Sequence, residues 1–482
     1  MRGDGSAIEG AADFAAVTGD GDGGLDGNGK ARERSRTRTA GLRADPFRIE
    51  VDEGVELRVE TLDLSDVLVG ELERSDGAAA QERELFDGRQ EDDRHKRQER
   101  FYENESYNLT EVQRPFPWAE ILGRGATPDK PIRVARAAGR CVLVTGAGGF
   151  IGGEMVRVLA QSGARRLVLV EIAEQALFQI HAEMTARGHG GRCVPVLGSV
   201  CDGGFLRAVF EEHRPELVVH AAALKQVPLM ERNPLAAVET NALGTWRVAL
   251  AAEEFDARAM VLISTDKAVA PRSVMGAAKR VAELAMLRPG RLEAGRMRRA
   301  AVRLANVIGS PCSVGPLFAE QIARGGPVTV THREARRFFL TLAEVAVLLA
   351  EAIDADAAEG VLIPEPGEAV RIEELARRMI AGTGRPDGAE VPIEFTALRP
   401  GEKLDERLAG AEEGVEGWAT AGLRRVKSPA AENLAARTAE LEAAIRERDL
   451  NAALRILGEL VPDYEASAVV RESVAEMGAS RV

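Results

Sequence analysis

The chain has 482 residues, of which 45% are hydrophobic and 29% charged, as expected for two or three globular domains. Its formal net charge of −13 argues against non-specific binding to nucleic acid. No apolar run is long enough to span a bilayer, and the polar, glycine-rich start does not resemble a signal sequence. We therefore expect a cytoplasmic protein without a transmembrane segment. The four cysteines lack metal-like spacing with histidine, so we expect reduced thiols and no metal site.

The first part of the chain differs in composition from the rest. Residues 1–114 begin with a stretch rich in Gly, Asp and Arg and end near a charge run, which predicts a polar, largely disordered region. No motif in that region carries chemistry. The segment 115–137 contains a short predicted helix at Trp118–Leu122 and leads toward the first core strand.

From residue 138 onward, short apolar segments alternate with amphipathic helical patterns. This alternation predicts an α/β fold, with a doubly wound parallel Rossmann sheet over 138–310. A smaller region over 311–410 and a helical C-terminal tail over 411–482 follow. The predicted strands are Val142–Thr145, Leu167–Glu171, Cys193–Leu197, Leu217–His220, Ala259–Ser264 and Ala300–Leu304.

The turn after the first predicted strand suits a dinucleotide. Gly146, Gly149 and Gly152 follow this strand and open a helical segment that also includes Phe150 and Ile151. Such glycines allow a tight turn, close approach of the backbone to a pyrophosphate, and close packing of helix on strand. The helix N-terminus supplies free N–H groups for phosphates. We therefore predict that these residues bind a dinucleotide cofactor.

An acid, Glu171, ends the second predicted strand about 20 residues further on, where it would bind the adenosine ribose hydroxyls. Because an acid repels a 2′-phosphate, we predict NAD rather than NADP. The alternative is a solvated acid at the end of a strand.

The fifth predicted strand leads into Thr265, Asp266 and Lys267. Polar groups at the carboxyl end of a parallel strand lie where open α/β sheets bind ligands. In the helical segment that follows, Lys279 lies four residues after Met275. Taken alone, the triplet could be a solvated cluster and Lys279 a surface lysine.

Several long motifs resemble a known family. Residues 118–465 are similar to the extended short-chain dehydrogenases, and most of all to bacterial UDP-N-acetylglucosamine 4,6-dehydratases of polysaccharide biosynthesis, the CapD-like enzymes. The resemblance implies a Rossmann fold, bound NAD, a UDP-sugar substrate and a homo-oligomer. It is carried by the segments His220–Pro234, Thr240–Thr245, Ile263–Ala268, Ser273–Arg280, Asn306–Ser310, Gly325–His332 and Leu398–Lys403.

The resemblance implies a role in the reaction for Thr265, Asp266, Lys267 and Lys279. A dehydratase of this class transfers a hydride from carbon 4 to NAD, removes the carbon 5 proton, eliminates water from carbon 6 and returns the hydride there. Lys267 would be the base at carbon 5 and Asp266 the acid for the departing hydroxyl. Thr265 would hydrogen-bond the carbon 4 hydroxyl, and Lys279 would bind the nicotinamide ribose. Met275 stands where most relatives have tyrosine and cannot transfer a proton.

These roles set physical requirements. A lysine base must be neutral, so we expect burial or nearby cations to lower the pKa of Lys267, while the pKa of Asp266 should be raised. Adjacent strand residues point to opposite faces, so both can act on one substrate only if the chain leaves strand geometry here. With Met275 inert, the carbon 4 proton would leave through Thr265 and water, or through Lys267.

Further cofactor contacts are implied near other strand ends. Ala221, Ala222 and Lys225 follow the fourth predicted strand, on the usual cofactor side. Asn241 would also contact the cofactor, but can equally brace the adjacent helix. Asp202 resembles an adenine-contacting acid, with a helix N-cap as the alternative.

The region 311–410 would bind the nucleotide sugar, together with residues from the sheet. Arginines suit a pyrophosphate because the guanidinium group offers fixed, charge-assisted donors. The resemblance gives that role to Arg337 and Arg399, with Asn306 and Lys225 also contacting substrate. Glu402 would accept hydrogen bonds from the uridine ribose hydroxyls.

Three hypotheses result. The first is a soluble nucleotide-sugar 4,6-dehydratase, a lyase acting on UDP-N-acetylglucosamine. The second is a nucleotide-sugar epimerase, against which Met275 argues because typical 4-epimerases resemble this sequence only with tyrosine there. The third is a catalytically silent NAD-binding protein. Leu224 and Gln226 replace an expected aromatic residue and histidine, so the resemblance predicts the reaction class better than the sugar.

Overall fold

The computed structural model describes residues 117–124, 131–287, 297–382, 391–427 and 433–479, which all belong to one compact unit, Glu105–Val482. The predicted polar region 1–114 lies outside these described residues. Within them, no helix is long and apolar enough to cross a membrane.

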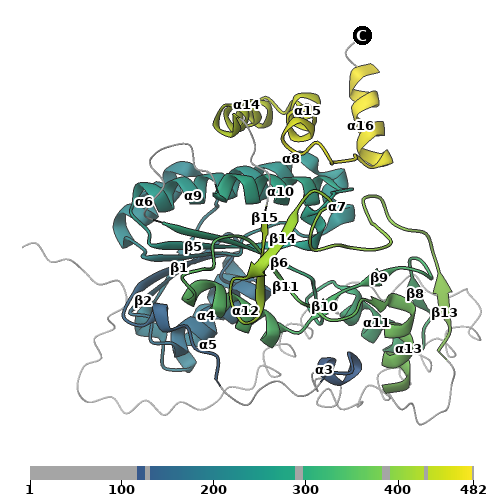
Figure 1. The fold of residues 1–482 in the computed structure, drawn as a ribbon, viewed down its shortest axis with the longest axis horizontal. Coiled ribbons are helices and arrows are strands. Elements are labelled where there is room, and N and C mark those ends of the chain that lie inside the picture. The colour runs from purple at the N-terminus through teal and green to yellow at the C-terminus, as the bar shows by residue number, and fades with distance from the viewer. Residues whose placement is uncertain (1–116, 125–130, 288–296, 383–390, 428–432, 480–482) are drawn as a thin grey trace, which may run out of the picture. The chain divides into compact units, whose positions relative to one another are not determined.

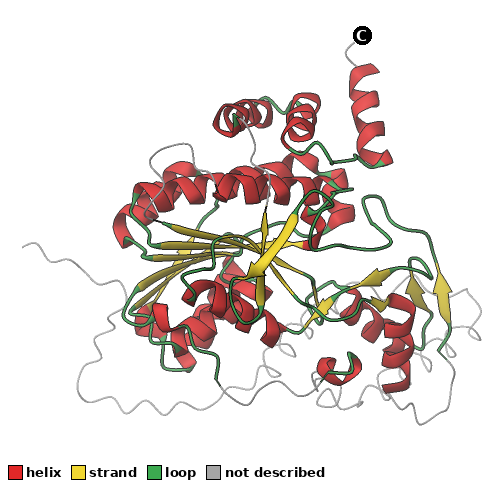
Figure 2. Ribbon diagram, in the orientation of Figure 1, coloured by secondary structure: helices red, strands yellow, loops and turns green. Residues whose placement is uncertain are grey.

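A nine-stranded sheet forms the centre of the unit (Figures 1 and 2). Its strands are β1 (Cys141–Thr145), β2 (Arg166–Glu171), β3 (Cys193–Leu197), β4 (Leu217–His220), β5 (Ala259–Thr265), β6 (Arg298–Leu304), β11 (Gly360–Pro364), β14 (Gly414–Trp418) and β15 (Leu423–Lys427). The order across the sheet is β14-β15-β11-β6-β5-β4-β1-β2-β3. All neighbours from β11 to β3 are parallel, whereas β15 and β14 are added antiparallel.

This order confirms the predicted doubly wound Rossmann sheet. The chain runs outward from β1 to β2 and β3, then crosses to β4 on the other side of β1. The switch point therefore lies between β1 and β4. Open α/β sheets bind ligands at such a point, outside the carboxyl ends of the strands.

Helices cover both faces of the sheet (Figure 2) because its central strands are apolar on both sides. In β1, Val142 and Val144 belong to one core cluster, and Cys141 and Leu143 to the opposite one. The first cluster is shared with α4 (Phe150–Gln161), α5 (Glu174–Ala186) and α12 (Leu342–Asp354). The second is shared with α6 (Gly203–His213), α9 (Gly244–Glu254) and α10 (Val274–Leu287).

The sheet does not end at the predicted boundary, residue 310. Strand β11 continues it in parallel, and β15 and β14 extend it from within the segment predicted as a helical tail. Sequence patterns missed these strands because β14 is exposed throughout and β15 is mostly charged. Their pairing depends on β11, whose side chains are buried from Val361 to Pro364.

A smaller region is built around its own apolar cluster, to which α3, α11, α13, β8 and β10 contribute. Its two-stranded sheets pair β10 with β7, β12 with β9, and β13 with β8. The elements are α3 (Trp118–Ile121), β7 (Asn306–Val307), α11 (Val314–Ala323), β8 (Val328–Val330), β9 (Arg336–Arg337), β10 (Phe339–Leu340), β12 (Val370–Arg371), α13 (Ile372–Gly382) and β13 (Ile393–Phe395).

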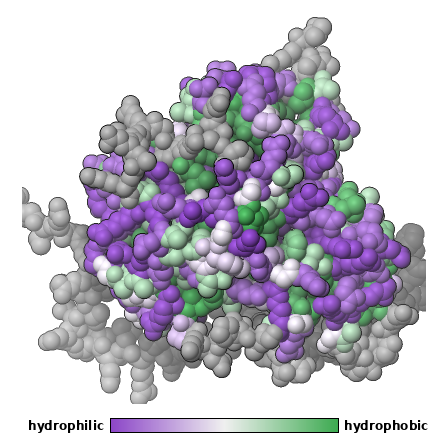
Figure 3. All heavy atoms as spheres, viewed as in Figure 1, coloured by the Kyte–Doolittle hydropathy of each residue, from purple (hydrophilic) through white to green (hydrophobic). Residues whose placement is uncertain are grey.

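The C-terminal helices pack on the outer side of α10 (Figure 1). Leu441 and Leu457 join α10 residues in one buried cluster, so α10 is covered on both sides. On the face seen in Figure 3, hydrophilic residues dominate the surface of the described part of the chain. The remaining elements are η1 (Ala135–Ala137), η2 (Gly190–Arg192), α7 (Val227–Arg232), α8 (Pro234–Ala237), the π-helix η3 (Val238–Leu243), η4 (Asp266–Ala268), α14 (Leu434–Arg446), α15 (Leu450–Leu460) and α16 (Ala468–Ala479).

Candidate active site

The glycine-rich turn packs directly against the loop after β4. Gly146 has a φ of +64°, and a Cβ added there would lie 2.7 Å from the Ala222 nitrogen. A Cβ on Gly152 would lie 2.0 Å from the Gly146 oxygen. Only glycine fits at these contacts. Gly149 is the N-cap of α4, so this helix begins at Phe150, at the switch point of the sheet.

The Glu171 carboxylate lies against the same turn. It accepts hydrogen bonds from the backbone N–H groups of Gly148 at 3.1 Å and of Ile172 at 2.9 Å. Glu171 thus connects the end of β2 to the glycine-rich turn. This position agrees with the expected place of a ribose-binding acid, and the contact with ribose stays a prediction.

Asp202 is the N-cap of α6, the alternative that the sequence left open. Its side chain accepts the Phe205 N–H at 2.9 Å. The structure accounts for this aspartate without a cofactor, and its adenine contact remains a prediction.

A buried chain of polar groups supports the loop after β4. The His220 ring lies between the hydroxyls of Thr145 at 2.6 Å and Thr245 at 2.9 Å, and the Thr245 hydroxyl donates to the Asn241 carbonyl. Burial, with a contribution from the positive charge of Lys279, lowers the pKa of His220 to about 3. His220 is therefore a neutral core residue.

Asn241 and Lys225 hold two segments of the site in place. The Asn241 side chain exchanges two hydrogen bonds with the Leu224 backbone, at 2.8 and 2.9 Å. It therefore braces the loop that carries Lys225, whose ammonium donates to the Pro311 carbonyl at 2.8 Å. Burial lowers the pKa of Lys225. Asn241 lies in the π-helix η3, a conformation frequent at functional sites.

The chain leaves strand geometry at the end of β5, as the expected chemistry requires. The turn η4 begins at Asp266, and the Thr265 hydroxyl accepts the Lys267 N–H while donating to Asp266 at 3.0 Å. The Lys267 ammonium donates to Asp266 and to the Asn306 side chain, both at 2.9 Å. Asp266 is fully buried, and its Oδ2 atom lacks a hydrogen-bond partner among the described residues. Four predicted site residues therefore meet here.

The expected lowering of the Lys267 pKa is wrong for this structure. Burial lowers this pKa and the cation Arg337 opposes protonation as well, but the carboxylates of Asp266 and Glu406 outweigh both, so the pKa is raised. The physical reason is that the Lys267 ammonium forms an ion pair with Asp266 at 2.9 Å. Lys267 is therefore protonated in the structure as it stands.

Helix α10 brings Lys279 against β5. Lys279 is 4% exposed, and its ammonium donates to the Ile263 carbonyl at 2.7 Å. Burial lowers its pKa to about 8, although the charge of Glu283 opposes this. Met275 is buried in an apolar cluster. A Cβ on Gly276 would lie 2.3 Å from the Lys267 oxygen, so glycine allows α10 to touch the turn η4.

The predicted substrate arginines are engaged with their own neighbours. Arg337 is buried and donates to the carbonyls of Lys403 and Leu404, both at 2.7 Å. Arg399 pairs with Glu402 at 2.6 Å and is largely exposed. Lys403 donates to the Val269 carbonyl at 2.8 Å and so ties this loop to η4. Contacts of these residues with a nucleotide sugar stay predictions.

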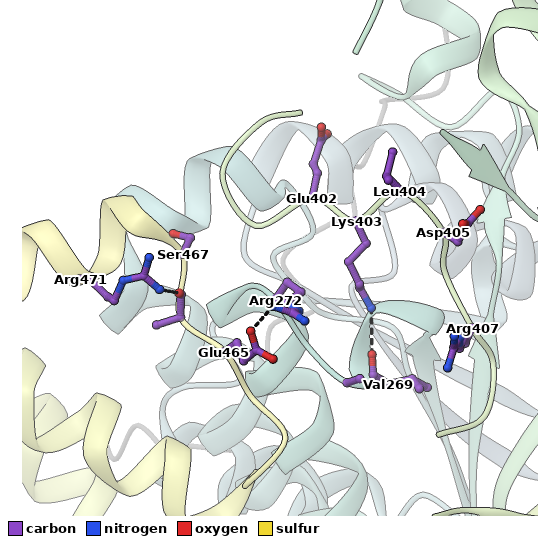
Figure 4. Close-up of a pocket in the computed structure, with 12 residues that line it drawn as sticks. Val269, Arg272, Glu402, Lys403, Leu404, Asp405, Arg407, Glu465, Ser467 and Arg471 are labelled. Carbon is purple, nitrogen blue, oxygen red and sulfur yellow. Dashed lines mark hydrogen bonds and ion pairs between the residues drawn. The ribbon is translucent and has the colours of Figure 1, made fainter. Parts of the chain in front are cut away.

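A cavity of about 610 Å³ adjoins this loop (Figure 4). Among the predicted residues, Glu402 lines it. One wall comes from residues 465–471. They lie inside the predicted tail 411–482, and sequence reasoning assigned them no role because they carry no motif. The charged and polar lining residues are Arg272, Glu402, Lys403, Asp405, Arg407, Glu465, Ser467 and Arg471.

The strand order, the glycine-rich turn at its switch point and the polar cluster at the end of β5 are those of an extended short-chain dehydrogenase/reductase with a Rossmann fold. The sequence profile described as polysaccharide biosynthesis protein matches residues 142–427, and the chain belongs to this family.

Relatives of known name agree with this assignment. The capsular polysaccharide biosynthesis protein CapD of Staphylococcus aureus is 39% identical over 297 residues, which cover 61% of this chain and 49% of CapD. The chain thus spans about half of the length of that relative. A UDP-glucose 4-epimerase of Rickettsia typhi is 34% identical over 202 residues, or 42% of this chain and 58% of the epimerase.

A solved structure with 29% sequence identity shares the fold. Pen from Bacillus thuringiensis has a TM-score of 0.52 and 29% identity, covering 56% of this chain and 83% of Pen. WbmH of Bordetella bronchiseptica was solved in complex with NAD⁺, and is a more distant neighbour with a TM-score of 0.44, 23% identity, and coverage of 54% of this chain and 88% of WbmH.

Proposed function

We propose that this protein is an NAD-dependent nucleotide-sugar 4,6-dehydratase that converts UDP-N-acetylglucosamine to a 4-keto-6-deoxy sugar for surface polysaccharide synthesis. The observation that carries the proposal is the pair of Asp266 and Lys267 in one turn at the end of β5, 2.9 Å apart. An elimination needs both an acid and a base, and this turn supplies the two side by side.

The residues around the switch point fit NAD. The backbone at Gly146 leaves no room for a side chain, so the turn can approach a pyrophosphate closely, and α4 begins beside it. Glu171 offers a carboxylate for ribose, and Lys279 offers a buried ammonium for the nicotinamide ribose. When bound, NAD supplies the hydride acceptor for carbon 4 and the donor for carbon 6.

The raised pKa of Lys267 indicates how acid and base arise together. In the structure Lys267 is an ammonium and its partner Asp266 a carboxylate. Transfer of one proton from the Lys267 Nζ to Asp266 gives a neutral amine and a carboxylic acid. The amine can then remove the carbon 5 proton, and the acid can protonate the departing carbon 6 hydroxyl. A substrate that displaces water favours the neutral pair, because a dry site disfavours charges.

Thr265 and Asn306 complete this assignment. The Thr265 hydroxyl borders Asp266 and is placed to hydrogen-bond the carbon 4 oxygen. Asn306 accepts from Lys267 at 2.9 Å and so restricts where the amine can point. Met275, buried in the apolar cluster around α10, contributes no proton transfer.

Solvent deuterium tests the proposal. In D₂O, wild-type protein with UDP-N-acetylglucosamine and NAD should form a product that carries one deuterium at carbon 5, because the proton removed there is replaced from solvent. Lys267→Met should form no such product, while Arg455→Met, on the exposed face of α15, should act as wild type. A product isomer without deuterium would instead indicate a 4-epimerase. Bound NAD with unaltered substrate would indicate another sugar or a silent protein.

A further inference from the structure

Four charged residues form a buried network behind the carboxyl end of β5. Arg303 of β6 donates to both Glu283 oxygens, at 2.9 and 2.7 Å, and to both Glu413 oxygens, at 2.6 and 2.8 Å. Arg280 of α10 joins the two carboxylates, at 2.8 Å from Glu283 and 2.9 Å from Glu413. The side chains of Glu283 and Arg303 are fully buried. Sequence reasoning gave none of these residues a role.

The network contacts the catalytic strand directly. The Ser264 hydroxyl donates to Glu283 Oε1 at 2.6 Å, and Ser264 immediately precedes Thr265. Glu283 also lies one helical turn after Lys279 on α10, and its charge acts on that lysine. The Glu283 carboxylate therefore acts on two residues of the proposed site. It reaches Thr265 through Ser264, and its charge acts on Lys279.

The network also anchors the far end of the predicted substrate loop. Arg303 donates to the Leu408 carbonyl at 2.9 Å, and Glu413 accepts the Gly410 N–H at 2.8 Å. The segment 408–413 directly continues the loop that carries Glu402. At the near end of that loop, Lys403 is tied to η4 through Val269. The loop is therefore fastened to the catalytic strand at both ends.

Stability alone is a weak reason for such a network. Two arginines and two glutamates balance in charge, but apolar residues of similar volume often stabilise a core as well or better than buried ions. What hydrogen-bonded ions add is defined geometry, since Arg303 holds both oxygens of Glu283 and both oxygens of Glu413.

We propose that Glu283 is a positioning residue for the reaction, which through Ser264 and Arg303 holds the end of β5 in register with the segment 399–413. This inference rests on the proposed function. Glu283 touches neither substrate nor cofactor, so it acts through Thr265, Lys279 and the loop that it helps to fix.

The effect of the Glu283 charge on the pKa of Lys279 provides a specific test of the inference. The groups that face Lys279 are Glu283 on its own helix and His220 on β4, and His220 is neutral at pH 7. Burial holds the pKa of Lys279 near 8, and Glu283 opposes that shift. Removing the charge of Glu283 therefore lowers this pKa further. Lys279 then loses its proton at a lower pH, and NAD binding should weaken at a lower pH.

The test is Glu283→Gln, with Glu459→Gln on the exposed face of α15 as the matched control. NAD affinity is titrated from pH 6 to 9, and kcat and KM are measured with UDP-N-acetylglucosamine. In Glu283→Gln, the midpoint of the fall in NAD affinity should move down by about one pH unit. Its kcat should fall by about tenfold or more with KM changed less. The control should match wild type in both measurements.

A merely structural role would give a different result. A Glu283→Gln protein with a lowered melting temperature but an unchanged midpoint and unchanged kcat would overturn the inference. If that variant does not fold, Ser264→Ala removes only one hydroxyl and keeps the ions. It should lower kcat by about tenfold at unchanged NAD affinity, and an unchanged kcat would overturn the inference. The midpoint is read from NAD binding alone, so it stays informative if the proposed substrate is wrong.

Discussion

Replacing Lys267 by methionine removes the ammonium that pairs with a fully buried carboxylate. The Lys267 nitrogen lies 2.9 Å from Asp266 Oδ1, with Asp266 unexposed and the lysine side chain 24% exposed. Opposite charges about 4 Å apart interact by about 4 kcal/mol at an effective dielectric constant near 20. Breaking a buried pair by removing one partner costs about 3–5 kcal/mol. Because Lys267 is partly exposed, we expect Lys267→Met to lower the free energy of unfolding by about 3 kcal/mol.

The double variant separates this charge effect from the loss of the side chain. Asp266→Asn combined with Lys267→Met leaves no charge in the turn, so most of the lost stability, about 2 kcal/mol, should return. Urea unfolding followed by circular dichroism measures both variants and the Asp266→Asn single variant. Arg455→Met breaks an exposed pair on α15 and should cost less than about 0.5 kcal/mol.

The result that refutes this reasoning is additivity. If the double variant loses the sum of the two single losses, within about 0.5 kcal/mol, then the two side chains do not interact as the structure places them. All three active-site variants should lack dehydratase activity, whatever their stability. Full activity in Lys267→Met would remove the assigned base.

Other predictions concern the cofactor. Lys279, with a pKa lowered to about 8, is charged at pH 7 and mostly neutral at pH 9, so NAD affinity should fall several-fold over that range. Lys279→Met should bind NAD weakly with little pH dependence. If its NAD affinity changed with pH as in wild type, the proposed contact of Lys279 with the nicotinamide ribose would be contradicted. Glu171→Ser should raise affinity for NADP relative to NAD by about tenfold or more, because a like charge is removed; an unchanged ratio in a competition titration would count against the ribose role. Asp202→Ala should cost about 1 kcal/mol as α6 loses its cap, whereas Asp202→Asn keeps it. If Asp202 contacts adenine, calorimetry should show that both variants bind NAD several-fold more weakly. Wild-type NAD affinity in both variants would mean that Asp202 serves only as the helix cap.

Strands β1 to β5 were predictable because they are almost wholly apolar, whereas the parallel strand β11 was missed although it is apolar as well. β1 to β4 begin within one residue of the predicted positions, β2 ends at the acid Glu171, and β3 ends at Leu197, directly before Gly198. The antiparallel extension was not predictable from pattern. Leu423 and Val426 are the buried residues of β15, and charged residues lie between and beside them, so no alternation is visible in the sequence.

In the candidate site, too, some features could be predicted from the sequence and others could not. Thr265, Asp266, Lys267 and Asn306 meet because strand ends of a parallel sheet share one edge, and sequence order alone places them there. The ionisation of Lys267 was not predictable, since it depends on which charges surround it in space, Glu406 among them.

The buried partners Glu283, Arg303 and Glu413 were also invisible to sequence reasoning. Up to 130 residues separate them along the chain, and each alone is an ordinary charged residue. Only the packing of α10, β6 and the segment before β14 brings them together.

The most direct test of the central claim is the mass of the product formed from UDP-N-acetylglucosamine by the purified protein with NAD. The account predicts a product lighter by one water, with a ketone that borodeuteride traps. A product of unchanged mass, resolved as an isomer, would contradict the dehydratase assignment and indicate epimerisation.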